Sequence, residues 1–210
     1  MYDLEEQEKV DALKAWWKDN GQWVWGIALA LALGYAGFQG WRYYQRTQAD
    51  KAGVLFEAVR VAAQQGDATK TLQAAKALQE AQPGSALAPR GALIAAAVSH
   101  AKGDNAAAQS ELDWVVGHAK EAALADLARL RQAGLLADDK KYDEALRLLE
   151  ANHEADFAAL TSDLRGDILL ALKRPDEARA AYTNAVEKSA AGDVLHQIAQ
   201  SKLEALGESK

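Results

Sequence analysis

The chain has 210 residues, half of them hydrophobic, with 30 acidic and 24 basic residues and a formal net charge of −6. The basic residues are scattered, so the sequence lacks the basic face that neutralises nucleic-acid phosphates. No cysteine is present, which excludes disulfides, thiolate zinc sites and cysteine nucleophiles. A composition rich in alanine, leucine and charged residues, with three prolines, predicts an all-α fold.

An uncharged run follows an acidic N-terminal tail over residues 1–22. No Asp, Glu, Lys or Arg occurs from Asn20 to Trp41. As a helix, residues 23–41 would span about 28 Å, close to the hydrocarbon thickness of a bilayer. Aromatic residues gather at both ends, as they do at membrane interfaces. We therefore predict a single transmembrane helix over 23–41, with these anchor residues: Trp23, Trp25, Leu29, Leu31, Leu33, Trp41 and Tyr43.

Two other interpretations of this run are a buried helix of a soluble protein and a cleaved signal peptide. The acidic tail argues against a signal peptide, which has a short basic lead. Lys9, Lys14 and Lys18 before the run are matched in number by Arg42, Arg46 and Lys51 after it, so the positive-inside rule does not give the orientation.

Small residues form a stripe at helical spacing within the predicted span: Gly26, Ala30, Gly34 and Gly37. Such a stripe allows another membrane helix to approach closely. The alternative is that alanine and glycine simply fill a short apolar helix, and the residues alone do not decide between the two.

After a predicted linker at residues 42–51, helix-sized segments recur over residues 52–210. Turn and cap residues separate them at Gly66-Asp67, Pro83-Gly84, Gly103-Asp104, Asp138–Lys141, Lys173–Pro175 and Gly192-Asp193. Segments align at offsets of 33 and 37 residues, near the 34-residue period of the tetratricopeptide repeat. Small residues recur at two aligned positions: Ala108, Ala145 and Ala178, and, twelve residues before each, Ala96, Ala133 and Gly166.

This spacing predicts a tetratricopeptide-like solenoid that ends in a capping helix over about Val194–Leu206. The first unit is the weakest, because Val59 and Thr71 stand where small residues are expected. An irregular helical bundle is the alternative.

The repeat pattern also places a candidate protein-binding groove on the inner helices. Its predicted residues are Phe56, Arg60, Leu93, Ala97, His100, Leu130, Gly134, Asp163 and Asp167. A clamp for a peptide carboxylate needs several Lys, Arg or Asn, and this set offers one, Arg60. A mixed surface of this kind suits another protein or an extended apolar segment, although Leu93 and Leu130 fit core positions equally well.

No catalytic constellation is visible. The four histidines are scattered without metal-ligand spacing, and no Gly-rich phosphate loop or nucleophile elbow occurs. The sequence therefore predicts a protein that is not an enzyme and has no cofactor, no metal and no small-molecule substrate. An active site assembled from distant residues stays the alternative.

Several motifs together resemble the YfgM family of bacterial inner-membrane proteins. They are the acidic start Tyr2–Glu8, then Val10–Lys14, Asn20-Gly21, Gly40–Tyr43, Asp163–Asp167 and Ala178-Arg179. The resemblance covers nearly the whole chain. It implies an ancillary subunit of the SecYEG translocon that associates with a PpiD-like periplasmic chaperone and helps pass newly translocated proteins to chaperones.

The resemblance also implies an orientation, with the N-terminus in the cytoplasm and the repeat domain in the periplasm. The alternative function is a cytoplasmic-facing membrane scaffold that binds a regulatory protein.

Overall fold

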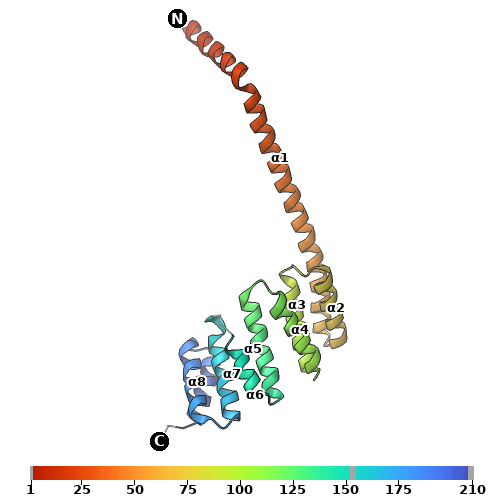
Figure 1. The fold of residues 1–210 in the computed structure, drawn as a ribbon, viewed down its shortest axis with the longest axis vertical. Helices are drawn as coiled ribbons and strands as arrows, with labels where there is room; N and C mark the ends of the chain where they lie inside the picture. Colours follow the sequence, from red (N-terminus) through yellow and green to blue (C-terminus); the bar gives the residue numbers. More distant parts are fainter. Residues whose placement is uncertain (1, 152–154, 208–210) are drawn as a thin grey trace. The chain divides into compact units, whose positions relative to one another are not determined.

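The computed structural model describes residues 2–151 and 155–207, and all the secondary structure in these residues is helical. The chain divides into two compact units, Met1–Asp50 and Lys51–Lys210 (Figure 1). Helix α1 (Tyr2–Gln64) contributes to both, since its last turns belong to the second unit.

The first unit consists of helix α1 alone, and its apolar surface is bare. All seven predicted anchor residues are between 59% and 76% exposed. Among the described residues, Glu8–Gln64 is the one segment long and apolar enough to cross a membrane, with a mean hydropathy of 1.2 in its most apolar window. An uncovered apolar surface of this length is unfavourable in water, which makes it a candidate transmembrane span. Residues 42–51, predicted as a linker, are helical and continue α1.

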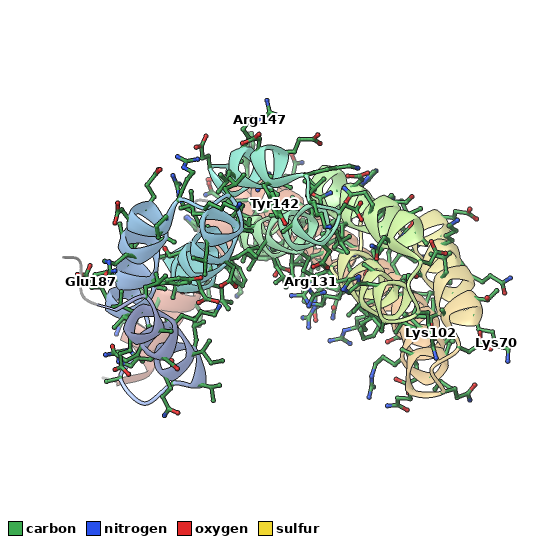
Figure 2. The ribbon with its side chains drawn as sticks, turned by 90° about the horizontal axis from the view of Figure 1, so that it is seen from below. Lys70, Lys102, Arg131, Tyr142, Arg147 and Glu187 are labelled. Carbon is green, nitrogen blue, oxygen red and sulfur yellow. The ribbon has the colours of Figure 1, made fainter. Side chains whose placement is uncertain are left out.

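The second unit is a stack of antiparallel helices. After the end of α1 come α2 (Ala68–Ala81), α3 (Leu87–Ala101), α4 (Asn105–His118), α5 (Ala122–Asp138), α6 (Tyr142–Leu149), η1 (Ala155–Phe157), α7 (Ala158–Ala171), α8 (Pro175–Lys188) and α9 (Val194–Ala205). From α2 onwards each α-helix contacts the next, and α3, α5, α7 and α9 also contact one another in succession. This is the contact pattern of stacked helix-turn-helix repeats. The stacked repeats form the arc seen in Figure 2.

The turn chemistry expected from the sequence forms at the predicted breaks. Asp67 and Asp104 cap α2 and α4 by accepting backbone N–H groups of Lys70 and Ala107, each at 3.0 Å. Pro175 occupies the first turn of α8. Two breaks were not predicted: the one between α4 and α5, and the one between α6 and α7. The first, at Ala119–Glu121, contains neither glycine nor proline, so its sequence reads as continuous helix.

The small residues predicted at helix crossings are all buried: Ala96, Ala108, Ala133, Ala145, Gly166 and Ala178. In the first repeat, formed by the end of α1 and α2, Val59 and Thr71 are fully buried at the equivalent places. The Thr71 hydroxyl donates to the Asp67 carbonyl oxygen at 2.7 Å, which satisfies its polar group inside the core. The first repeat, although degenerate in sequence, thus packs like the others. The tetratricopeptide-like architecture is confirmed.

Helix α9 ends the stack as the predicted cap. Ala199 is buried, and Leu203 and Leu206 pack against the core cluster around Leu169 and Tyr182. Arg179 of α8 donates to the carbonyl oxygens of Leu206 and Gly207, the latter by a short contact. These carbonyls lie at the end of α9, where backbone acceptors lack helical partners, so the guanidinium caps the capping helix.

Candidate protein-binding groove

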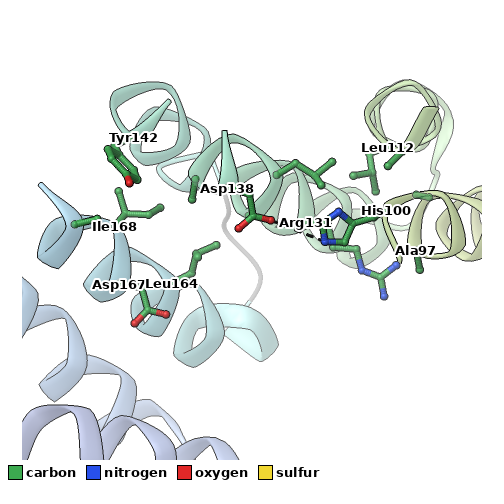
Figure 3. A pocket seen from close by; sticks show the side chains of 15 residues that line it. Ala97, His100, Leu112, Arg131, Asp138, Tyr142, Leu164, Asp167 and Ile168 are labelled. Atoms are coloured by element: carbon green, nitrogen blue, oxygen red, sulfur yellow. Dashed lines mark ion pairs between the residues drawn. The ribbon is translucent and has the colours of Figure 1, made fainter. Parts of the chain in front are cut away.

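A groove of about 570 Å³ runs between α3, α4, α5, α6 and α7. Its floor is apolar and largely buried, and the residues that make the floor are Ala96, Ala108, Leu112, Leu135 and Ile168. Polar and charged side chains surround this floor: His100, Arg131, Asp138, Tyr142 and Asp167 (Figure 3). A concave apolar surface with a few polar groups at its rim is typical of binding sites, whose volumes are about 300–1,000 Å³.

Arg131 is the cation of this rim, and it lies on the inner side of the arc (Figure 2). Its side chain is exposed, and its Nη1 donates to the Leu93 carbonyl oxygen at 3.1 Å. Loss of solvation against the groove wall lowers the pKa of the Arg131 guanidinium, which nevertheless stays charged at neutral pH. Among the residues that the structure describes, none places a carboxylate within ion-pair distance of it.

His100 and Asp138 lie beside each other at the rim of the groove, with His100 Nε2 at 3.9 Å from Asp138 Oδ2 (Figure 3). The other ring nitrogen, Nδ1, lies 2.9 Å from the Asn105 side-chain oxygen. Both His100 and Asp138 are about half exposed or more, so this contact is a weak, water-screened one. It leaves Asp138 available as an acidic group at the rim.

Asp167 belongs to a charge cluster that ties α9 to α7 and α8. Lys202 Nζ lies 2.8 Å from the Asp167 carboxylate and 2.9 Å from Asp163 Oδ2, and the Tyr182 hydroxyl donates to Asp167 Oδ1 at 2.7 Å. Burial lowers the pKa of Lys202, but its hydrogen bonds and charge interactions with Asp167 and Asp163 outweigh this and raise it overall. Burial, then the hydrogen bond to Asp167, raises the pKa of Tyr182.

The structure brings together four residues of the predicted groove, Ala97, His100, Gly134 and Asp167, which all line the groove. The others lie elsewhere. Leu93 is 6% exposed in the core, and Leu130 packs half-buried against the core cluster of Ala133 and Ile168.

The remaining predicted residues are at the two ends of the stack. Phe56 is half-buried and packs against the core cluster that includes Val59 and Leu78. The neighbouring Arg60 pairs with Glu57 at 2.8 Å. Asp163 is held by Lys202.

Arg131, Asp138 and Tyr142 line the groove but were not among its predicted residues. The signal was present on α5, because Arg131, Gly134 and Asp138 follow one another at spacings of three and four and so share a helix face. Choosing Leu130 in place of Arg131 rotated the predicted inner face by one residue, toward the apolar side of α5 that packs on the core.

No group of three or more His, Cys, Asp or Glu side chains suited to hold a metal ion occurs within residues 8–151 and 155–207, whose side chains the structure describes. In the groove, the titratable side chains are spread around an open apolar floor and do not surround one reacting position. The groove combines a concave shape, an apolar floor and separated charges.

The stacked helices and the groove define a tetratricopeptide repeat-like protein with one candidate transmembrane helix. The model of the tetratricopeptide repeat-like domain family matches residues 14–208.

Curated relatives match the chain from end to end. A protein of Neisseria gonorrhoeae named an ancillary SecYEG translocon subunit is 32% identical over 97% of this chain and 98% of its own length. Proteins with the same name from Haemophilus influenzae and Escherichia coli are 28% and 27% identical, over 96% and 94% of this chain. The chain belongs to the YfgM family, to which these ancillary translocon subunits belong.

Proposed function

We propose that this protein is a non-catalytic, membrane-tethered, protein-binding subunit of the SecYEG translocon. It helps pass newly translocated proteins to periplasmic chaperones, and it works beside a PpiD-like membrane-anchored chaperone. The observation that carries the proposal is the end-to-end match to ancillary translocon subunits, since it includes both the bare apolar helix and the repeat domain.

The proposed mechanism is restricted diffusion. The anchor residues of α1 hold the chain in the bacterial inner membrane, which keeps the groove near the exit of the translocon. Tethering raises the effective concentration of the groove near an emerging chain, so a low binding affinity of the groove is sufficient. No chemical step is required of the groove residues.

The proposed topology is single-pass, with the N-terminal tail in the cytoplasm and residues 52–210 in the periplasm. The family resemblance supports this orientation. Cleavage of the repeat domain by protease added to intact spheroplasts is the expected result. Protection of the domain in spheroplasts, with cleavage only after lysis, would favour the alternative of a cytoplasmic-facing scaffold that binds a regulatory protein.

The small-residue stripe of α1 is the proposed contact with another membrane helix. Nothing in the described structure lies within 4 Å of a Cβ added at Gly26, Gly34 or Gly37, so this surface is open. Without side chains there, two helix backbones approach closely and gain van der Waals contact that lipid tails do not replace.

Affinity purification of the tagged full-length protein from membranes in mild detergent tests the proposal. Translocon subunits and a periplasmic chaperone are expected to copurify in amounts above those with an unrelated tagged single-span protein. Recovery of neither class of partner above that control would contradict the proposed function.

A further inference from the structure

The groove carries a positive and a negative side chain at separate positions along its wall. Arg131 and Asp138 lie seven residues apart on one face of α5, which places them two turns, about 10 Å, apart along the helix axis. The apolar floor of Ala96, Leu112 and Leu135 is part of the same groove. The groove therefore combines a cation, an apolar surface and an acidic group.

The two acidic groups of the rim each lie beside a nitrogen-bearing side chain, whereas Arg131, among the described residues, does not lie beside a carboxylate. Asp167 is held by Lys202, and Asp138 faces His100. Arg131 has five N–H donors, and within the described part of the chain its one recorded hydrogen bond is to the Leu93 carbonyl oxygen. An arginine that is accessible, partly desolvated and without a carboxylate offers donors for a bidentate contact.

We propose that Arg131 binds a carboxylate of an extended polypeptide partner whose adjacent apolar side chain enters the groove. This inference rests on the proposed protein-binding function and names the chemistry that the groove selects. A basic side chain further along the same segment meets Asp138. The preferred sequence therefore carries an acidic residue, then aliphatic or aromatic residues, then a basic one.

The partner is a polypeptide segment because the groove is open and is lined from five consecutive helices of the stack, which suits an extended chain better than a compact solute. Charge complementarity at its two ends also fixes the direction in which the segment lies. A purely apolar segment would leave the guanidinium desolvated and unpaired, which is unfavourable.

Fluorescence anisotropy with full-length protein in detergent and short synthetic peptides tests the inference. The probes are a Glu-Leu-Leu-Lys-type peptide and the matched Gln-Leu-Leu-Lys-type peptide. For the wild-type protein we expect the acidic peptide to bind about tenfold more tightly, the size expected for a charge-assisted contact. Arg131→Gln should remove this preference while leaving the weaker binding of the Gln peptide unchanged.

Matched controls separate the charge from the apolar floor. Arg147, which is exposed on the outer side of the arc (Figure 2), is the control cation, and Arg147→Gln should keep the full preference. Ala97→Leu narrows the groove without changing a charge and should weaken both peptides alike. Equal binding of both peptides to the wild-type protein, no binding of either, or a preference that survives Arg131→Gln would overturn the inference.

The same variants distinguish this inference from the proposed function. If translocon subunits copurify with the wild-type protein and with Arg131→Gln, but the peptide preference is absent, the carboxylate site is wrong and the translocon role stands. If they copurify with neither, the proposed function fails, whatever the peptides show.

Discussion

The aromatic ring of Tyr182 on α8 occupies the space beside Gly166 on α7. A Cβ added at Gly166 would lie 2.6 Å from Tyr182 Cδ1 and 2.8 Å from Cζ, and the ring is 1% exposed. Such distances are below van der Waals contact, so the ring and any side chain at position 166 exclude each other. The tyrosine ring therefore fits at this helix crossing only because position 166 is a glycine.

Gly166→Ala should therefore destabilise the repeat domain by about 1–3 kcal/mol, because the ring or the backbone must move. Thermal unfolding followed by circular dichroism measures this. Gly117→Ala on α4 is the matched control, since nothing lies within 4 Å of its added Cβ, and it should be neutral or stabilising by up to about 1 kcal/mol. A Gly166→Ala protein as stable as the wild type would show that the contact is not a constraint.

Tyr182→Phe keeps the ring but removes the hydrogen bond to Asp167, and should cost about 0.5–1.5 kcal/mol at neutral pH. The effect depends on pH in one direction. Because the folded state raises the pKa of Tyr182 above its ordinary value of 10.0, the unfolded chain loses this proton first. Wild-type stability then falls as the pH rises above that value, and the difference from Tyr182→Phe should shrink. Denaturant unfolding of both proteins at neutral and alkaline pH measures this stability difference. A difference that grows with pH would contradict the prediction.

Lys202→Met should loosen the cap. The change removes the cation shared by Asp163 and Asp167 and should cost about 1–2 kcal/mol, since the cluster is partly buried. Hydrogen exchange should accelerate in α9 more than in α3. The raised pKa of Lys202 means that its contribution is complete at neutral pH and is lost only as the pH rises above the ordinary lysine value.

Lys188→Met, at an exposed lysine of α8, is the control for the cap variant. It should leave exchange in α9 at the wild-type rate. Equal acceleration by both variants would indicate a general loss of charge and not a specific lock between Lys202 and its two aspartates.

Glu111 offers a test at the acidic end. It is 2% exposed, and burial raises the pKa of its carboxyl despite a 2.5 Å hydrogen bond from Gln79 Nε2. The folded state therefore holds this proton more tightly, so stability falls as the pH rises from the ordinary value of 4.5 through the folded pKa. Glu111→Gln should raise the melting temperature at neutral pH, and the gain should diminish in acid. Glu187→Gln, at an exposed site, is the matched control for removing one carboxylate. A Glu111→Gln protein less stable than the wild type at neutral pH would contradict this prediction.

The periodic parts of the fold could be predicted from the sequence, because their packing and capping leave local signals. Buried alanines and glycines at helix crossings, and caps such as Asp67 and Asp104, leave local signals that recur with the repeat. The break at Ala119–Glu121 was missed because its residues give no local stop signal.

The groove was predicted in part because its residues depend on helix rotation. Ala97, His100, Gly134 and Asp167 line the groove in the structure, whereas Leu93 is in the core. On α5 the predicted inner face was off by one residue, so Leu130 was predicted where Arg131 lines the groove. The cluster of Lys202, Asp163 and Asp167 joins residues more than 30 positions apart, for which a single sequence gives no pairing signal.

Site-specific photocrosslinking in intact membranes directly tests whether this chain works in contact with the translocon. A photoreactive residue is placed in turn at Gly26, Ala30 and Gly34 on the small-residue stripe, and at Ala28 and Tyr35 on the opposite face of the helix. We expect crosslinks to a translocon subunit, with higher yields from the stripe. No crosslink to a translocon subunit from any of these positions, in membranes that contain the protein at its natural level, would contradict it.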